Sequence, residues 1–354
     1  MDVTAPAHRL SAAVSAASRL LPARARLWLR ADSGGLTVAG SDADLAVRLR
    51  CPATSHTDGS VAVPAAPLAE TLKMLDTELV RLVVEGSRLA LRLDNARFAL
   101  PLLAAEAEGP AGELARVSEV DGSAFASALR IVAGTAAKDD PLPLFTGVRL
   151  QADGDRLTLT ASDRYRMAVA RLSLRASGSL DVLVPAVLLT EAARQARGVV
   201  GLHLGPGRFG LSWEGGLVGT AVLDAGFLSE DSIPSGAVDT TVSLDADALA
   251  AAVRRVGVYA EDRRVLTLEV GDAHVRLASA RQDTGEAEET LKADVLGGRT
   301  SPSFQARYLL DALQAFAGER VVLSIQPGMR ACLLRAVEPG EVTLTYYLMP
   351  MLPR

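Results

Sequence analysis

The segments VAVPAAPLAETLKML (61–75), VLVPAVLLTEAARQA (182–196) and SFQARYLLDALQAF (303–316) repeat one pattern along the chain. In each, an alternating apolar stretch typical of a strand is followed by an Ala/Leu-rich stretch with the 3.6-residue period of a helix. The change occurs at Pro64, Pro185 and Ala306, at a constant interval of 121 residues. Proline is compatible with a helix start, where its missing N–H would have no partner. The spacing therefore predicts a recurring structural unit.

Two further series of segments recur in the same order. The Ser-Asp pairs of LTVAGSDADLAVRL (36–49) and LTLTASDRYRMAVARL (157–172) are again 121 residues apart, and segment 275–291 has the same alternation with a longer polar turn. Helical patterns open the three copies at 8–21, 123–138 and 246–259. We therefore predict an α+β fold of three tandem domains, in each of which two helices pack on antiparallel sheets.

The expected domains are 1–115, 116–236 and 237–354. The expected linkers, near 106–119 and 229–240, are rich in Gly, Pro, Ser and acidic residues.

Composition restricts the class of protein. The 354 residues are 49% apolar and 22% charged, with a net charge of −5, 30 Gly, 17 Pro and two Cys. This excludes a disordered, collagen-like or disulfide-stapled chain, and no run of eighteen apolar residues could span a membrane. We read the N-terminus as a first helix, not as a signal peptide. The isolated Cys51 and Cys332 indicate the reducing cytoplasm. At face value the acidic balance disfavours a nucleic-acid partner.

Catalytic and metal-binding motifs are absent from the sequence. The four His residues have no metal-ligand spacing, and no Gly-x-Ser-x-Gly or Walker motif occurs. GPGRFG (205–210) matches the letters of a dinucleotide-binding loop, but it lies between two strand patterns, so we expect a hairpin turn. Acidic pairs such as Asp139-Asp140 lie in polar turns. We therefore predict a scaffold with no enzymatic activity, cofactor or metal.

Three motifs carry a family resemblance. The block TGVRLQADGDRLTLTASDRYRMAVARL (146–172) resembles the second-domain block of bacterial DNA polymerase III β subunits, the sliding clamps. FQARYLLDAL (304–313) is similar to a third-domain helix of that family, and YYLMPM (346–351) is similar to its closing strand. The resemblance covers the whole chain, because the family also has a triplicated unit with two helices per copy.

The resemblance implies a head-to-tail homodimer that closes as a ring of six DNA-clamp domains around duplex DNA and tethers the polymerase. Its seam would join Phe98 and Leu100 of one copy to Val258 and Tyr259 of the other. Phe98 and Leu100 could instead be ordinary core residues of a strand. The implied partners are a second copy of the chain, duplex DNA read without sequence preference, the DNA polymerase III catalytic subunit, the clamp loader and other proteins with a clamp-binding motif.

Charge distribution supports a DNA-binding surface. The six proposed helices contain ten basic and five acidic side chains, a net charge of +5, so the remainder of the chain carries −10. Helices with this charge would attract phosphates without reading bases. Each residue alone could be an ordinary solvated charge. The DNA-facing candidates are Arg19, Arg24, Arg26, Lys73, Arg130, Lys138, Arg194, Arg197, Arg254 and Arg255.

The resemblance also implies a cleft in which partner proteins insert an extended peptide with apolar anchors. Several of its residues, Phe145, Met167 and Met349 among them, could instead be core. The matching positions are Phe145, Ser162, Arg164, Tyr165, Arg166, Met167, Leu228, Ile233, Gln305, Tyr308, Tyr347, Met349, Pro350 and Met351.

The chain departs from the family pattern at the cleft. Arg164-Tyr165 stands where the family has a glycine-histidine pair, and Phe227-Leu228-Ser229-Glu230 replaces its phenylalanine-proline-x-tyrosine motif. The first domain also lacks several residues of the family between Arg26 and Leu27. We therefore expect a divergent clamp with altered preference for peptides or small molecules. Two alternatives remain: a clamp-like scaffold that binds such ligands without encircling DNA, and a hydrolase that uses an acidic pair.

Overall fold

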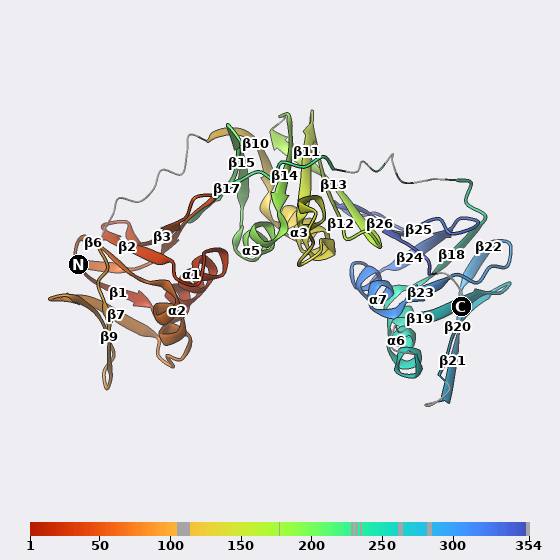
Figure 1. Ribbon diagram of the computed structural model, residues 1–354, viewed down its shortest axis with the longest axis horizontal. Coiled ribbons are helices and arrows are strands. Elements are labelled where there is room, and N and C mark those ends of the chain that lie inside the picture. Colours follow the sequence, from red (N-terminus) through yellow and green to blue (C-terminus); the bar gives the residue numbers. More distant parts are fainter. Residues whose placement is uncertain are drawn as a thin grey trace. The chain divides into compact units, whose positions relative to one another are not determined.

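Helices and strands follow one another in three similar series (Figure 1). The computed structural model describes residues 1–104, 114–176, 178–227, 230, 233, 236–260, 265–281 and 285–351. The first series is β1 (Asp2–Pro6), α1 (Ala7–Leu20), β2 (Arg26–Asp32), β3 (Gly35–Ser41), β4 (Leu45–Cys51), β5 (Thr54–Thr57), β6 (Gly59–Pro64), α2 (Ala65–Lys73), β7 (Leu79–Glu85), β8 (Arg88–Arg92) and β9 (Arg97–Pro101).

The second and third series repeat this order with small variations. The second is β10 (Ala115–Asp121), α3 (Gly122–Thr135), the short α4 (Pro143–Thr146), β11 (Gly147–Asp153), β12 (Arg156–Ser162), β13 (Arg166–Ala176), β14 (Leu180–Pro185), α5 (Ala186–Gln195), β15 (Val199–Gly205), β16 (Arg208–Trp213) and β17 (Gly216–Ala221). The third is β18 (Thr240–Asp245), α6 (Ala246–Val256), the 3-10 helix η2 (Gly257–Tyr259), β19 (Val265–Val270), β20 (His274–Arg281), β21 (Gly285–Lys292), β22 (Asp294–Gly297), β23 (Ser303–Gln305), α7 (Ala306–Gln314), β24 (Arg320–Ile325), β25 (Cys332–Ala336) and β26 (Thr343–Leu348).

The helices begin where the repeated pattern predicts. Pro64 and Pro185 are the N-caps of α2 and α5, with extended ψ values of 129° and 125°. Because proline has no N–H to leave unsatisfied, it is tolerated at this boundary between strand and helix. In α6 the cap is a side chain, since Asp245 Oδ1 accepts a 2.7 Å hydrogen bond from the Ala248 N–H.

The chain divides into two compact units. Unit 1 comprises Met1–Ala126, Ala152–Asp155 and Leu174–Leu223, and unit 2 comprises Ser127–Gln151, Arg156–Ser173 and Asp224–Arg354. The division passes through the second series, so unit 1 contains the whole first series and unit 2 the whole third series.

Antiparallel pairing joins neighbouring series within each unit. In unit 1, β17 pairs with β4, with Val218 opposite Val47, while β5, β1, β7, β8 and β9 form a separate sheet. In unit 2, β13 pairs with β26, with Val169 opposite Thr345. A separate sheet of that unit has the order β21-β20-β19-β23. The β13–β26 pairing places residues of the second and third series side by side at the predicted cleft.

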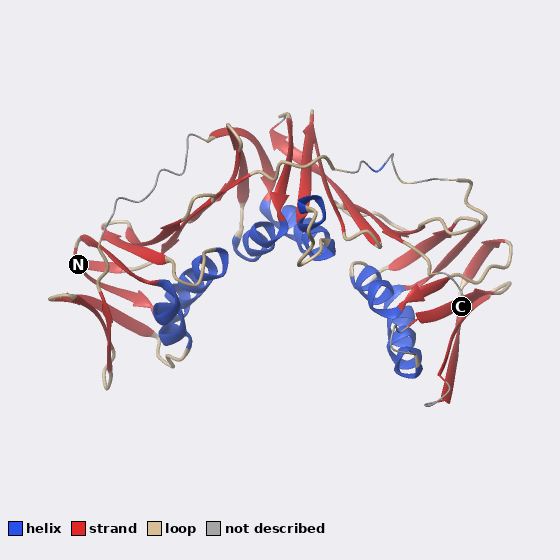
Figure 2. Cartoon of the chain, viewed as in Figure 1, coloured by secondary structure: helices blue, strands red, loops and turns tan. Residues whose placement is uncertain are grey.

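Paired helices cover one side of the strands in the first and third series (Figure 2). Leu10, Val14 and Ala17 of α1 are fully buried, as are Leu309 and Leu313 of α7. Each such leucine removed from water stabilises the fold by about 2 kcal/mol. The predicted α+β fold is confirmed.

Three boundaries differ from the prediction. Helices α3 and α5 end at Thr135 and Gln195, so Lys138 and Arg197 lie in the loops that follow. Ala196 leaves the helical conformation with ψ 126° because the chain turns there toward β15. The linker predicted over 106–119 ends sooner, since β10 begins at Ala115, and its residues 106–113 lie outside the described residues. The segment GPGRFG forms the expected hairpin between β15 and β16.

Candidate functional site

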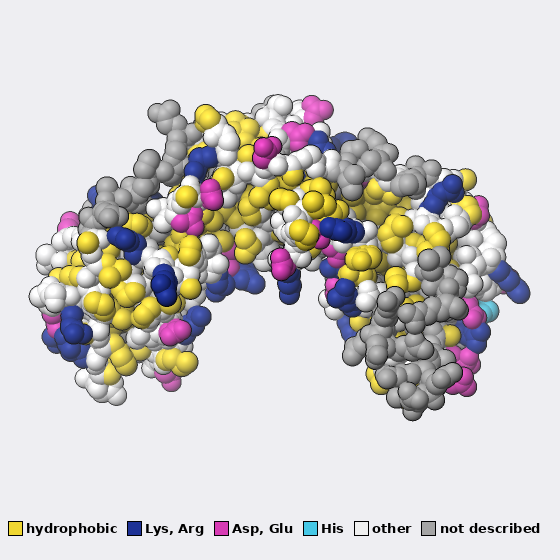
Figure 3. All heavy atoms as spheres, viewed as in Figure 1, with side chains coloured by type: hydrophobic (Ala, Val, Ile, Leu, Met, Phe, Trp, Pro, Cys, Tyr) yellow, Lys and Arg dark blue, Asp and Glu magenta, His cyan; other side chains and the backbone are white. Residues whose placement is uncertain are grey.

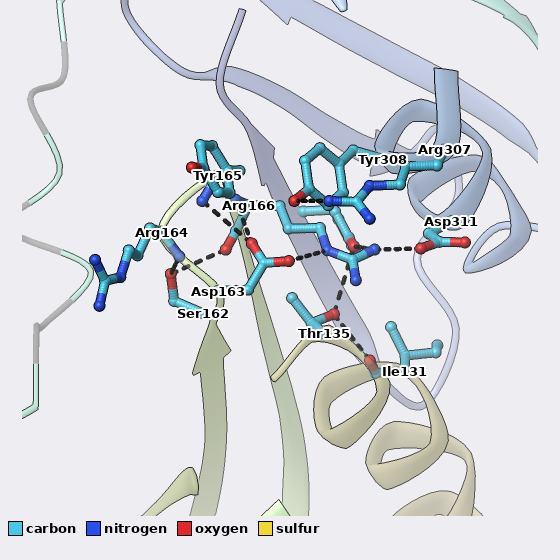
Figure 4. Close-up of polar contacts among 11 residues, drawn as sticks. Ile131, Thr135, Ser162, Asp163, Arg164, Tyr165, Arg166, Arg307, Tyr308 and Asp311 are labelled. Carbon is cyan, nitrogen blue, oxygen red and sulfur yellow. Dashed lines mark hydrogen bonds and ion pairs between the residues drawn. The ribbon is translucent and has the colours of Figure 1, made fainter. Parts of the chain in front are cut away.

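A tight turn between β12 and β13 organises the site (Figure 4). Asp163 Oδ1 accepts hydrogen bonds from the N–H groups of Tyr165 and Arg166, both at 3.1 Å. Ser162, which is buried, donates from Oγ to the Arg166 carbonyl at 2.9 Å. An aspartate that binds the backbone two and three residues ahead fixes a turn locally. The turn therefore presents Arg164, Tyr165 and Arg166 in set directions.

Arg166 connects this turn to the third series. Its side chain is only 9% exposed, and its Nε donates to Asp163 Oδ2 at 2.9 Å. Its Nη1 donates to Asp311 Oδ2 of α7 at 2.5 Å and to the Tyr346 hydroxyl of β26 at 3.2 Å. Thr135 of α3 also donates to that hydroxyl, at 3.4 Å. One buried guanidinium thus ties the turn, α7 and β26 together, and the Tyr346 hydroxyl adds α3.

Burial and charge act in opposite directions on this group. Burial alone would lower the pKa of Arg166, but the Tyr346 oxygen and the carboxylates of Asp163 and Asp311 outweigh it and raise that pKa. For Tyr346, burial raises the pKa of the phenol despite the neighbouring guanidinium. Arg166 is therefore a permanent cation with satisfied hydrogen bonds, as a buried charge requires.

Beside Arg166, two tyrosines stack. The rings of Tyr165 and Tyr308 lie 5.6 Å apart at 19°, and the Arg307 guanidinium lies 4.4 Å from the Tyr308 ring centre. The Met349 N–H donates to the Tyr165 carbonyl at 2.9 Å, which joins the end of β26 to the turn. Tyr165 and Met349 are 52% and 38% exposed. The site therefore offers an aromatic and thioether surface that an apolar side chain could contact.

Arg164 points away from this stack (Figure 4) and lies on Phe145. Its guanidinium is 4.6 Å from the Phe145 ring centre and donates to Asp140 Oδ1 at 2.7 Å. Asp140 also accepts from the Leu142 N–H at 2.9 Å. The acidic pair considered for hydrolysis thus holds an arginine and a loop.

An apolar cluster lies farther along β13. Tyr347 donates to Glu230 Oε1 at 2.5 Å, and Arg171 forms an ion pair with the same carboxylate. Burial, followed by the bond to Glu230, raises the pKa of Tyr347 to about 12. The cluster consists of buried Met167, Val169, Ala331 and Tyr347, with half-buried Ile233 and Leu333 against them.

The structure brings most of the predicted cleft residues together in unit 2. Phe145 and Met167 are buried, while Pro350 and Met351 follow β26 and Gln305 precedes α7. Met351 pairs with Ser303 next to Gln305 through a 2.7 Å backbone hydrogen bond. Leu228 lies outside the described residues.

The sequence analysis missed residues that hold the site together. Asp163 carried a signal, because its Ser-Asp pair recurs 121 residues after Ser41-Asp42. The others lie in segments that the sequence analysis quoted, but it did not name them as cleft residues, because their contacts join distant segments; they are Asp140, Glu230, Arg307 and Asp311.

A cavity of about 610 Å³ lies on the other side of Arg166, between α3 and α7. Its charged lining residues are Arg130, Lys138, Arg166 and Asp311. Two of them, Arg130 and Lys138, are DNA-facing candidates from the sequence.

The remaining basic candidates lie on or beside helices. Figure 3 shows Lys and Arg side chains projecting where α5 lies in Figure 1. Arg19 and Arg194 both bind the buried carboxylate of Glu191, at 2.7 and 3.0 Å. Arg255 pairs with Glu289 at 2.6 Å, and Arg26 donates to the Ala104 carbonyl at 3.1 Å. The others are exposed, namely Arg24, Lys73, Arg197 and Arg254.

The four seam candidates differ in exposure. Phe98, Val258 and Tyr259 are 41%, 75% and 39% exposed, whereas Leu100 is buried within its own sheet. Leu100 is thus a core residue of its strand, as the alternative to a seam role predicted, whereas Phe98 is not. Single exposed apolar side chains are normal on a folded surface, so the seam stays a prediction.

Family models of the DNA polymerase III beta subunit match nearly the whole chain. The N-terminal domain matches residues 7–108, the central domain 119–228 and the C-terminal domain 232–352. The chain belongs to the sliding clamp family. The beta sliding clamp of Streptomyces coelicolor is 29% identical over 366 residues, an alignment that covers 97% of this chain and 96% of that relative.

Solved clamps share the fold. The beta subunit of Thermotoga maritima superposes with a TM-score of 0.89 at 20% identity, with both chains fully covered. The Pseudomonas aeruginosa clamp bound to griselimycin gives 0.86 at 22% identity, again with full coverage of both chains. The predicted fold of three clamp domains and the predicted sliding clamp function are confirmed. No helix in the described part of the clamp is long and apolar enough to span a membrane.

Proposed function

We propose that two copies of this clamp close head to tail into a ring around duplex DNA and tether the replicative polymerase without catalysing a reaction. The domains would be 1–115, 116–236 and 237–354, and the ring would act in the cytoplasm. The observation that carries this proposal is a contrast of charge: the helices of the described residues carry +4, and the remainder of the chain carries −9. A surface of this kind attracts phosphates at any sequence.

Two sheet edges support ring closure. Strand β9 is an edge of its sheet and lies beside β8, so this edge carries Arg88, Arg92 and Arg97. Strand β21 is an edge of another sheet and carries Glu286, Glu288 and Glu289. Open edges invite pairing, and opposite charges select the partner. Glu85 already binds Arg92 and Arg97, and Glu288 and Glu289 bind Arg276 and Arg255, so the attraction between the edges of two copies would come mainly from Arg88 and Glu286.

The site in unit 2 would bind the peptide motifs of the polymerase, the clamp loader and other partners. Tyr165, Tyr308 and Met349 supply an adaptable apolar surface, and the buried Arg166 network supplies a rigid base for it. Griselimycin, which binds the Pseudomonas clamp, should compete with such peptides here if it uses the same site.

Retention on plasmid DNA tests the ring. Clamp loaded on a nicked circle should stay bound in a gel-filtration column and should be lost when the circle is cut once, because a ring slides off free ends. Equal retention on circular and linear DNA would contradict the proposal. Sedimentation adds a second test, in which a species near twice 37.0 kDa is expected.

Basic surface residues give the matched variants. Arg254→Glu should reduce retention at moderate salt because it repels phosphates, while Arg299→Glu, at an exposed ion pair outside the proposed DNA surface, should not. In a plot of log affinity against log salt concentration, the slope is negative, and removing one phosphate-binding side chain should reduce its magnitude by about one.

A further inference from the structure

Arg164 has a backbone conformation that its residue type disfavours. Its φ is +78°, and among the described residues it is the single non-glycine with positive φ. It occupies the first central position of the two-residue turn closed by the Asp163 N–H, which donates to the Arg166 carbonyl at 3.2 Å. A non-glycine residue there costs about 1–2 kcal/mol. An arginine at this position therefore calls for a compensating role.

Contacts of the Arg164 side chain identify that role. The guanidinium covers the ring of Phe145, itself 8% exposed, and its ion pair with Asp140 holds it there. Side chains of Arg164 and Asp140 are 45% and 15% exposed, so solvent and ligands reach the arginine more easily than its partner. We name Arg164 and its partner Asp140 the Arg164 cover of Phe145.

A neutral apolar ligand has to displace the cover in order to reach Phe145. Displacement would break the ion pair between Arg164 and Asp140. The Asp140 carboxylate, which is mostly buried, would then have no cation beside it, and this raises the free energy of the complex. A ligand that brings its own carboxylate avoids part of this cost, because Arg164 can swing to the new anion while the apolar side chain takes its place on the ring.

A second cation lies on the other tyrosine of the stack. Arg307 stacks on Tyr308 and donates to its hydroxyl at 2.6 Å, so among the described residues its guanidinium has no carboxylate partner. Two accessible cations, Arg164 and Arg307, thus lie at opposite ends of the tyrosine stack (Figure 4), and three carboxylates of the site are engaged: Asp163 and Asp311 by Arg166, and Asp140 by Arg164.

We propose that Arg164 determines specificity in this cleft, so that the clamp selects peptides with a carboxylate beside an apolar anchor over neutral peptides with the same anchor. The inference rests on the proposed peptide-binding function and adds the chemical class of the preferred partner segment.

Fluorescence anisotropy with the full-length clamp tests this preference. The probes are two fluorescein-labelled hexapeptides with an amidated Leu-Phe end, which differ only in Glu or Gln before that pair. We expect the wild type to bind the Glu peptide about fivefold more tightly, the size typical of a half-exposed charge pair. Arg164→Gly should abolish the preference and bind the Gln peptide more tightly than the wild type does.

Two further variants separate a specific effect from a general one. Asp140→Asn removes the competing carboxylate, so it should increase the preference for the Glu peptide. Arg81→Ala removes a similar arginine–aspartate pair, 2.5 Å long, in unit 1 and should change neither dissociation constant.

Each outcome decides between hypotheses. Equal binding of both peptides by the wild type, or an unchanged preference in Arg164→Gly, would overturn the role of Arg164 while leaving the cleft in place. If neither peptide binds to any variant, the peptide-binding part of the proposed function is wrong as well, and plasmid retention then tests the ring separately.

Discussion

The turns after β3 and β12 share a hydrogen-bond pattern and differ in their side chains. In the first, Asp42 Oδ1 accepts from the N–H groups of Asp44 and Leu45, and in the second Asp163 does the same for Tyr165 and Arg166. The Asp42 and Asp163 N–H groups close the turns on the carbonyls of Leu45 and Arg166 at 2.9 and 3.2 Å. Both turns thus rest on one aspartate that recurs at the repeat interval.

The two turns differ at their fourth residue, which is Leu45 in the first and Arg166 in the second. Leu45 is an apolar residue of the core, whereas Arg166 is equally buried but charged, and it binds Asp311 and Tyr346. Repetition has therefore preserved the group that fixes the backbone, while the side chains that the turn presents have changed. In this protein a residue that recurs in both turns thus indicates the fold, and the residues that differ between them indicate the site.

Chromophores allow the two turns to be followed separately. Both tryptophans, Trp28 and Trp213, belong to unit 1, and all five tyrosines belong to unit 2. Tryptophan fluorescence therefore reports on the unit that holds the Asp42 turn. Tyrosine absorbance reports on the unit that holds the Asp163 turn.

Arg166→Ala should have the largest effect. It leaves Asp163 without its buried cation and removes the bonds to Tyr346 and Asp311, so the free energy of unfolding of unit 2 should fall by about 4 kcal/mol. Urea titration followed by tyrosine absorbance measures this loss, and peptide binding should disappear with it.

The matched variant is Leu45→Ala, which should destabilise unit 1 by about 3 kcal/mol through a cavity. Its peptide binding should be unchanged. Loss of peptide binding in both variants would show that the two turns are not functionally distinct.

High pH should weaken unit 2 through Tyr347. In the unfolded chain this hydroxyl ionises at its ordinary pKa of 10.0, and in the folded chain at about 12. Between these values the unfolded state binds fewer protons, so the free energy of unfolding falls as pH rises, by about 2.5 kcal/mol in total. Below pH 10 the contribution is fully present.

Denaturant titrations between pH 9 and pH 12 measure this loss. Tyr347→Phe keeps the ring and should show a shallower fall with pH, since one titrating group is removed. An identical fall in the wild type and in Tyr347→Phe would exclude Tyr347 as its origin.

Local patterns predicted the elements better than the contacts between them. The helix starts at Pro64 and Pro185 follow from periodicity, which is a property of neighbouring residues. The helix ends were less predictable, as Lys138 shows, because the chain can leave a helix wherever tertiary contacts favour it.

Most of the site depended on sheet register. The pairing of β13 with β26 brings Tyr346 to Arg166, and α7 brings Asp311, which is 145 residues away in sequence. Family motifs pointed to Arg166 and contain Asp311, but they do not show that the two side chains meet, and no family motif marks Asp140. The positive φ of Arg164 is not visible in this chain's own residues, because an arginine does not mark such a turn position; the signal was the glycine that the family has there.

Asparagine in place of the two turn aspartates should affect the stability of the two units differently. Asp42→Asn keeps an oxygen that accepts from the Asp44 and Leu45 N–H groups, so we expect a change below about 0.5 kcal/mol. Asp163→Asn keeps the same turn bonds but loses the charge opposite Arg166, so unit 2 should lose about 2 kcal/mol. Equal effects in the two units, measured by urea titration, would mean that Arg166 does not depend on the charge of Asp163.

Glycine at the first central position of each turn should give the smallest effects. We expect glycine to cost less stability in place of the large Arg164 than in place of the small Ala43. Ala43 is exposed and its φ is not positive, so Ala43→Gly should lower the stability of unit 1 by about 1 kcal/mol through the added freedom of the unfolded chain. Arg164→Gly has the same entropic cost and loses a half-exposed ion pair, but it relieves a positive φ worth about 1–2 kcal/mol. We therefore expect unit 2 to change by less than about 0.5 kcal/mol. Arg164→Gly could instead destabilise unit 2 more than Ala43→Gly destabilises unit 1. The contacts of Arg164 would then stabilise the fold by more than its positive φ costs. Folding alone would explain the arginine, and a role in binding specificity would not be needed.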